Sequence, residues 1–403
     1  MLKAQVINKA TTLMERLKKI SDSRDNRGKR HPLPFVLACV LIAMMSNRSY
    51  MSSIHRYIKH KIDWLKDIFD CPEATAVSRA QLPNILAGVD WESLNAVFKE
   101  LFGICIEQQN GEWKAVDGKS LKGTIVDPTQ AHHHERIVLI VGHTSHDVLE
   151  QQRFSGAKES EVTVVRDLLK QTGLVGDKIS LDAGHAYPDT LEPIHEAGGI
   201  YVVQIKQNQP QLFKTLAQLA EQVEQAEMEQ EETEPVEFPA TGVVITTVEK
   251  GHGRLEERTG RVLSLDPDLL DQRWDPAGMK TLIVMDRSTE DLKTGVTSDE
   301  RSYYVSNQPA PTHEHDLFDA VRGHWRIESM NWIRDVTFNE DQVRTKNPKT
   351  GQILSSLRTV ALTLLQALHP VNLKAKLEEF ADRPDALRDL LVRFKLVSVV
   401  SGS

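Results

Sequence analysis

The spacing of apolar residues changes along the chain and divides it into four stretches. Up to residue 108 they recur every three to four positions, with prolines as breaks, which predicts an all-helical N-terminal domain, 1–108. From 109 to 206 short β-rich runs take over, and helical segments at 159–172 and 188–197 lie between the later runs. Neighbouring strands followed by alternating helix and strand are typical of an α/β fold with a mixed sheet. The predicted strands are Lys114–Val116, Ile137–Val141, Val148–Phe154, Ile179–Leu181 and Ile200–Ile205.

The second half of the chain returns to helical spacing after a segment of different character. Residues 207–300 begin with a Glu-rich helical stretch and continue with alternating apolar and polar residues, which predicts a β-containing insertion. Residues 301–370 start with the strand-like run SYYVSN and then become helical. We therefore expect the α/β core to consist of 109–206 and 301–370, with the insertion between them and a helical C-terminal tail, 371–403, after them.

The charge of the chain is unevenly distributed. Its 49 Lys and Arg against 57 Asp and Glu give a net charge of −8, which taken alone argues against a nucleic-acid partner. Residues 1–70, however, hold 14 Lys and Arg and only six Asp and Glu, whereas residues 221–240 hold eight Glu and no basic residue. One end of the chain can therefore face DNA while an acidic segment cancels its charge in the sum.

The sequence predicts neither a membrane partner nor a disulfide framework. The longest uninterrupted apolar run, Phe35–Met45, has eleven residues, and a helix that spans a bilayer needs about 20. The three cysteines are odd in number and scattered, as is common for buried thiols in the cytoplasm. We therefore expect a cytoplasmic protein of ordinary globular composition, with two or three domains.

Three carboxylates stand out by their context. Asp117 and Asp182 each follow a short apolar strand and precede small residues, and Glu328 lies in a strongly helical stretch beside a histidine and two tryptophans. Taken singly, a strand-end aspartate more often caps a turn, and a helical glutamate is more often solvated or salt-bridged. Brought together, they could hold two Mg²⁺ (or Mn²⁺) ions roughly 3.5 to 4 Å apart and activate a phosphodiester for hydrolysis.

Seven strings along the chain resemble, in order, the motifs of the insertion-sequence As1 type of transposases, also known as H-repeat-associated proteins. The strings are AVDGKSLKGT (115–124), GAKESEV (156–162), SLDAGHA (180–186), VVQIKQNQPQLF (202–213), GHGRLEER (251–258), YYVSN (303–307) and HWRIESMNWIRDVTFNEDQVR (324–344). The helical region from about Asp25 to Gly103 is similar to the N-terminal domain associated with that family. The resemblance covers most of the chain.

This resemblance implies an RNase H-like catalytic core whose Asp-Asp-Glu triad binds two divalent ions and cuts and joins DNA. Carried over by motif, the triad falls on Asp117 in VDGK, Asp182 in LDAG and Glu328 in HWRIES. The N-terminal helices would bind the transposon ends or contribute to assembly. Because two ends must be held together, a homodimer or larger complex on double-stranded DNA is expected.

The chain also departs from the family pattern next to the third acid. Members usually have an Asn after the catalytic Glu and a Leu-His before the next Trp, and here these positions are Ser329, Met330 and Asn331. The triad itself is intact. Two alternatives to a transposase therefore stay open: a domesticated, non-catalytic DNA-binding regulator, and a metal-dependent nuclease that cuts DNA without joining it.

Further residues are candidates for contacts with the DNA backbone, which position DNA without reading its sequence. Those on the core are Lys119, Lys122, Lys206 and Asn208. Those expected to form a basic strip are Arg254 and Arg258 in the insertion, with Arg344 and Lys346 after the Glu-bearing helix. Those on that helix are Arg322, His324 and Trp325. For the two lysines after Asp117 a solvated turn is an equal alternative, and Trp325 could either stack on a base or pack the helix on the sheet.

Overall fold

The computed structural model describes most of the chain. The described residues are 12–25, 29–102, 111–124, 135–145, 148–155, 159–231, 243–251, 253–310, 312–345, 347–368 and 370–397. Within these ranges no helix combines the length and the apolar character needed to cross a membrane. The N-terminal helices are α1 (Leu13–Leu17), α2 (Leu33–Met45), α3 (Met51–His60), α4 (Ile62–Ile68), α5 (Gln81–Ala87) and α6 (Trp91–Phe102).

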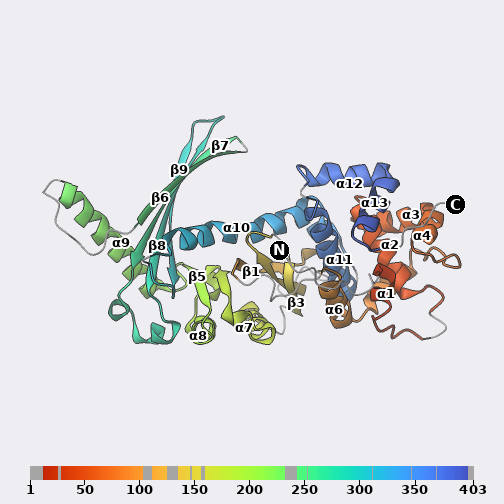
Figure 1. Cartoon of the computed structure of the whole chain (residues 1–403), viewed down its shortest axis with the longest axis horizontal. Helices are drawn as coiled ribbons and strands as arrows, with labels where there is room; N and C mark the ends of the chain where they lie inside the picture. The colour runs from red at the N-terminus through yellow and green to blue at the C-terminus, as the bar shows by residue number, and fades with distance from the viewer. Residues whose placement is uncertain are drawn as a thin grey trace, which may run out of the picture.

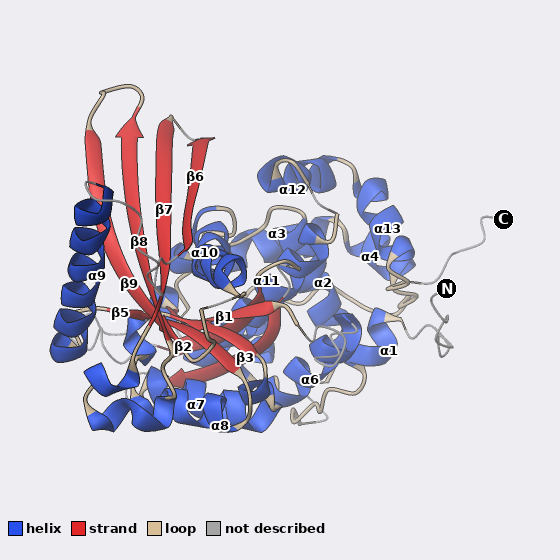
Figure 2. Cartoon of the chain, turned by 60° about the vertical axis from the view of Figure 1, so that its left-hand side comes forward, coloured by secondary structure: helices blue, strands red, loops and turns tan. Residues whose placement is uncertain are grey.

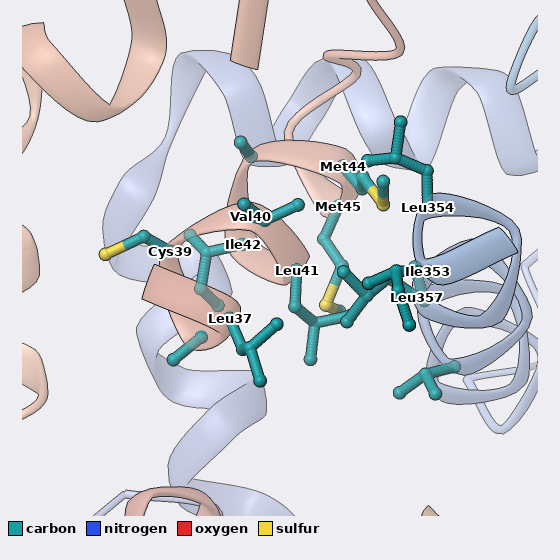
Figure 3. Packing of buried hydrophobic residues seen from close by; sticks show 14 of the residues in the cluster. Leu37, Cys39, Val40, Leu41, Ile42, Met44, Met45, Ile353, Leu354 and Leu357 are labelled. Carbon is teal, nitrogen blue, oxygen red and sulfur yellow. The ribbon is translucent and has the colours of Figure 1, made fainter. Parts of the chain in front are cut away.

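The expected apolar run forms α2, which is buried on all sides. A helix that is apolar all round needs neighbours all round. These are provided by α1 and α3 and by α11 (Pro348–Gln366) from the far end of the sequence. Figure 3 shows Leu41 and Met45 of α2 beside Ile353 and Leu357 of α11. The remaining helices of this region are α12 (Leu373–Asp382) and α13 (Pro384–Arg393).

The core of the fold is a mixed sheet with strand order β3-β2-β1-β4-β5. The strands are β1 (Trp113–Ser120), β2 (Glu135–Gly142), β3 (Val148–Ser155), β4 (Lys178–Leu181) and β5 (Ile200–Ile205). The first three are antiparallel neighbours, whereas β1, β4 and β5 run parallel. The parallel pairs are connected through α7 (Glu161–Thr172) and α8 (Pro188–Glu196). This is the predicted α/β, RNase H-like arrangement, and the fold class is confirmed.

The insertion extends the same sheet. It contains α9 (Pro210–Glu231), β6 (Val243–Gly251), β7 (Arg254–Ser264), β8 (Thr281–Asp291) and β9 (Thr297–Ser306). β9 pairs antiparallel with β5, and β8, β7 and β6 follow outward to give nine strands. Figure 2 shows these long strands rising beyond the core, with α9 alongside. The predicted boundary at residue 300 falls inside β9, so core and insertion share a continuous strand; the division into domains stays a prediction.

Both faces of the core sheet are covered, because residues of each strand alternate between them. Val138 and Ile140 of β2 pack with α7 and α8, while Ile137 and Leu139 face the N-terminal helices and α11. The long helix α10 (Glu314–Val336) crosses β1 on this second face. In Figure 1 it runs between the long strands on one side and the helical region on the other.

The short 3₁₀ helices among the described residues are Lys122–Thr124, Leu174–Gly176, Ala183–His185, Pro267–Leu269, Gln272–Ala277 and Glu340–Gln342.

Candidate active site

Asp117 and Asp182 lie on adjacent parallel strands. The prediction that the first strand ends at Val116 is wrong, because β2 pairs with β1 as far as Ser120. Pairing of β1 with β4, however, stops at Val116 and Leu181. Asp117, within β1, and Asp182, directly after β4, are therefore the first residues beyond the last rung that pairs these two parallel strands.

Glu328 lies on α10, close enough to Asp182 for the two charges to interact. Burial and the charge of Asp182 raise the pKa of Glu328, while Lys206 lowers it. Burial also raises the pKa of Asp117 to about 7, with further increases from the charges of Asp182 and Glu161. Asp182 thus acts electrostatically on both other members of the predicted triad. The setting of Asp117 and Glu328 thus disfavours their ionised forms unless a cation is present, and the role of the triad stays a prediction.

One residue of the altered motif contacts the first acid directly. Asn331 Nδ2 donates to Asp117 Oδ2 at 3.1 Å, and the Gly118 amide donates to Asp117 Oδ1 at 2.8 Å. Asn331 lies one turn after Glu328 on the same helix, so both side chains can reach β1. Asn331, one of the residues that depart from the family pattern, is therefore a hydrogen-bond donor to Asp117.

His324 is half-buried, one turn before Glu328 on α10. Its Nδ1 lies 3.0 Å from Ser180 Oγ, which in turn lies 2.8 Å from Nε2 of His143. Burial lowers the pKa of His324 to about 4, despite the opposite effect of Asp182. The ring is therefore neutral at pH 7, and it fixes α10 to β4 rather than presenting a positive charge to DNA.

Two residues of the site, Glu161 and His185, were not predicted from the sequence. Glu161 opens α7 directly after Ser160, whose hydroxyl caps the helix by accepting the Thr163 amide at 3.2 Å. Its carboxylate lies against Gly118, where an added Cβ would overlap it. His185 Nε2 lies 3.5 Å from Glu161 Oε1 and 3.7 Å from Asp182 Oδ1. The sequence offered one signal for Glu161: it lies in the string GAKESEV, which resembles a family motif.

The chemistry of these groups fits a divalent cation. Oxygen ligands are those that Mg²⁺ prefers, and few of them are needed because the ion keeps several waters. Asp182 Oδ1 is buried and accepts no hydrogen bond from any described residue. Within the described ranges, no group of three or more His, Cys, Asp or Glu is already drawn together as a metal cage. Oxygen donors are thus present, and one of them, Asp182 Oδ1, lacks a hydrogen-bond partner among the described residues.

The two lysines after Asp117 differ in their surroundings. Lys119 is only 7% exposed, and its ammonium lies 2.6 Å from Asp335 on α10. Lys122 is exposed and lies 2.9 Å from Asp341. Lys119 therefore ties β1 to α10, and of the two only Lys122 faces solvent. Their contacts with DNA stay predictions.

Lys206 and Asn208 follow β5, near the triad. Lys206 is exposed and acts on the charge of Glu328. Asn208 Nδ2 donates to the Ala183 carbonyl at 2.7 Å and so fastens this loop to the segment after Asp182. Lys206 and Asn208 thus lie near the segment that carries Asp182, and Lys206 places one exposed positive charge beside the carboxylates.

A groove of about 770 Å³ separates α10 from the long strands. Arg322 of α10 and Arg258 of β7 both bind Glu249 of β6, the latter at 3.1 Å. Trp325 is 46% exposed, and the Arg287 guanidinium lies 5.2 Å from its ring centre. The tryptophan is therefore partly stacked and partly open to solvent, so both of its predicted roles stay possible.

The expected basic strip is spread over different elements. Arg254 is exposed at the β6–β7 turn, whereas Arg344 is exposed after the last 3₁₀ helix. The amide of neighbouring Thr345 donates to Gly123, which places that segment near the end of β1. Lys346 lies outside the described residues. Arg254, Arg258 and Arg344 thus belong to at least two surfaces.

Comparison with known proteins shows the family to which the chain belongs. Residues 112–364 match the family described as "Transposase DDE domain", and residues 14–102 match the one described as "DDE_Tnp_1-associated". The protein named "Putative transposase YncI" from Escherichia coli O157:H7 is 26% identical over 366 residues, covering 88% of this chain and 87% of the relative. The "H repeat-associated putative transposase YhhI" of Escherichia coli K12 is 24% identical, covering 97% and 98%. The chain belongs to the family of transposases with a DDE domain.

Proposed function

We propose that this protein cuts DNA at the ends of an insertion sequence and joins the freed ends to target DNA. The proposal is supported by the position of Asp117 and Asp182 just beyond the last paired rung of two neighbouring strands, with Glu328 on the helix that crosses β1, and by the electrostatic effect of Asp182 on both other acids. Transposases of this family act on DNA and generally use divalent metal ions. The three carboxylates would hold two Mg²⁺ or Mn²⁺ ions.

The proposed reaction has two steps on the same site. Water attacks a phosphodiester at the transposon end, the bond from phosphorus to the 3′ oxygen breaks, and a 3′ hydroxyl is released. That hydroxyl then attacks a target phosphodiester and displaces its 3′ oxygen. When bound, the metal ions would lower the pKa of the attacking water or hydroxyl and offset the charge that develops on the phosphate.

The surrounding residues support this chemistry in distinct ways. Asn331 and the Gly118 amide hold the carboxylate of Asp117, and neutral His324 fixes the helix that bears Glu328. Lys206 supplies a positive charge near Glu328, in a position suited to a phosphate. The remaining DNA contacts are proposed for Lys122 and for the arginines of the groove.

Supercoiled plasmid carrying the gene with its flanking DNA provides the test, since no terminal sequence has to be known. With Mg²⁺ or Mn²⁺ we expect cleavage at the flanks and joined products, and neither in EDTA. Asp117→Asn and Glu328→Gln should lower both by more than about 100-fold, because disturbing groups that merely orient metal ligands already costs 10 to 100-fold. Glu314→Gln, at the start of the same helix, is the matched control.

The other outcomes separate the alternatives. Cleavage without joined products would identify a nuclease on this fold. Binding of DNA without either product would identify a non-catalytic regulator. Cleavage that survives Asp117→Asn and Glu328→Gln would show that the proposed site is wrong.

A homodimer or larger complex on paired ends is proposed as the active assembly. Light scattering with and without end DNA measures the mass of that assembly.

A further inference from the structure

Glu161 brings a fourth carboxylate to the edge of the sheet where the triad lies. It comes from the first turn of α7, so it approaches on the side opposite to α10. Its carboxyl group lies against Gly118, the residue directly after Asp117, in space that any larger side chain would occupy. Its charge acts on Asp117. The fold thus keeps two acids in close approach although like charges repel.

His185 lies between this fourth acid and the second member of the triad. It is 1% exposed, and its Nε2 is 3.5 Å from Glu161 Oε1 and 3.7 Å from Asp182 Oδ1. Neither ring nitrogen makes a hydrogen bond to a described residue. A buried polar group without a partner is costly. An imidazole in this place, aimed at two carboxylates, is therefore evidence of a site that is completed by something else.

An ion pair with Arg136 does not account for the position of Glu161. Arg136 Nη1 lies 3.7 Å from Glu161 Oε2, beyond hydrogen-bond distance, and Arg136 Nε is itself buried with no hydrogen-bond partner among the described residues. The other carboxylate oxygen, Oε1, is directed to His185. A residue that served only the arginine would need neither the gap at Gly118 nor the contact with the histidine.

We propose that Glu161 is a fourth carboxylate ligand of the metal site, and that His185 positions it together with Asp182. This inference rests on the proposed function, because it concerns the same metal ions. The negative charge of the site would then come from four acids on four elements: Asp117 of β1, Asp182 at the end of β4, Glu161 of α7 and Glu328 of α10. His185 is a positioning residue: its Nε2–H would donate to one of the two carboxylates once the side chains close around a cation.

Calorimetric titration of the full chain with Mn²⁺, in the absence of DNA, tests the role of Glu161. Glu161→Gln keeps the size of the side chain and should lower the affinity for Mn²⁺ by about ten-fold or more. Asp167→Asn removes one negative charge from the exposed side of the same helix and should leave the affinity unchanged. Melting temperatures of all variants in EDTA verify that each is folded.

The outcomes distinguish this inference from the proposed function. If wild type binds Mn²⁺, Asp117→Asn loses it and Glu161→Gln retains wild-type affinity, only the fourth ligand is wrong. If Arg136→Gln and Glu161→Gln lower the melting temperature equally and neither changes Mn²⁺ affinity, Glu161 serves the arginine. If wild type binds no Mn²⁺, the proposed metal site fails, and the fourth ligand with it.

The test of His185 must separate the loss of its N–H donor from the loss of its packing. His185→Leu fills the space and removes the N–H, so Mn²⁺ affinity should fall several-fold. His185→Gln provides an amide donor at a similar reach, and should recover part of that affinity. Equal affinities for the two variants would overturn the positioning role.

Discussion

The fold disfavours the ionised form of Asp117, which predicts an unusual dependence of stability on pH. Its pKa is raised to about 7, from roughly 3.9 in an unfolded chain. Between these values the folded protein holds a proton that the unfolded chain has released. In EDTA the free energy of unfolding should therefore fall as pH rises from about 4 through 7, by a few kcal/mol.

Asp117→Asn removes this effect. At pH 8 in EDTA the variant should be more stable than wild type, and at pH 4 the two should be alike, as measured by urea unfolding. Saturating Mn²⁺ should reverse the order at pH 8, because only wild type gains a ligand. A variant less stable than wild type at pH 8 without metal would contradict the crowding of the carboxylates.

Lys119 and Lys206, both predicted to contact DNA, should behave differently. Lys119 is buried against Asp335, so Lys119→Met leaves an acid without its partner and should lower the free energy of unfolding by about 1–3 kcal/mol, with little effect on affinity for duplex DNA. Lys206→Met should leave stability unchanged and weaken DNA binding, because the exposed ammonium lies beside the triad. Urea unfolding and binding titrations measure the two effects, and the reverse pattern would exclude this division of roles.

At the scale of elements, a buried ion network holds the end of α10. Glu340 accepts hydrogen bonds from Arg334 of α10 at 2.9 Å and from Arg358 of α11 at 3.4 Å. Arg358 also donates to the Ser49 carbonyl, between α2 and α3. Burial would raise the pKa of Glu340, but the two arginines lower it to about 2. The network thus joins the Glu328-bearing helix to the N-terminal and C-terminal helices.

Glu340→Gln should be strongly destabilising. It leaves two buried guanidinium groups without a counter-charge, and breaking such a pair costs about 3–5 kcal/mol. Because the pKa of Glu340 is depressed, its stabilisation is present above about pH 4 and is lost as the pH falls toward 2, so the difference between variant and wild type should shrink in acid. Urea unfolding at pH 3 and pH 7 measures this, and a constant difference would argue against an ionised Glu340.

Elements with a clear local period could be predicted, and contacts between distant elements could not. Helix 159–172 appears as α7 (161–172), because its apolar spacing and capping serine are local signals. The length of β1 was missed, since Asp117 to Ser120 are held by pairing with β2 rather than by apolar composition. Neither reading of Lys119, a DNA contact or a solvated turn, included its burial, because its partner Asp335 is 216 residues away. Glu161 was missed for the same reason: only the fold brings α7 against Gly118.

At the scale of the whole molecule, the sequence-distant ends form one core. Leu41 of α2, Leu357 of α11 and Leu139 of β2 belong to the same buried cluster, so the helical region and one face of the catalytic sheet are packed as a unit. The opposite end of the molecule is different: the outer half of β9 is exposed and that of β8 is half-buried. The groove beside α10 lies between that helix and the long strands, so changes in its charges should alter DNA binding without disturbing the core.

Glu249 pairs with two arginines of this groove, and we expect its charge to control how strongly the groove binds DNA. It engages Arg258 and Arg322 together, and its hydrogen bond with Arg322 lowers its pKa, so it stays ionised at neutral pH. A phosphate backbone in the groove would compete with Glu249 for both arginines. Glu249→Gln should therefore strengthen binding to duplex DNA at about 0.1 M salt, and should steepen the dependence of affinity on salt by up to about 0.9 for each phosphate gained.

Arg322→Gln should act in the opposite direction, weakening binding and flattening the salt dependence by a similar amount. Glu379→Gln on α12 removes a charge that pairs with Lys376 away from the groove, and serves as the control for net charge. Salt titrations of fluorescent duplex binding, run for the three variants and wild type, separate the cases. If Glu249→Gln and Glu379→Gln raise affinity equally, the gain comes from net charge alone and DNA does not follow this groove.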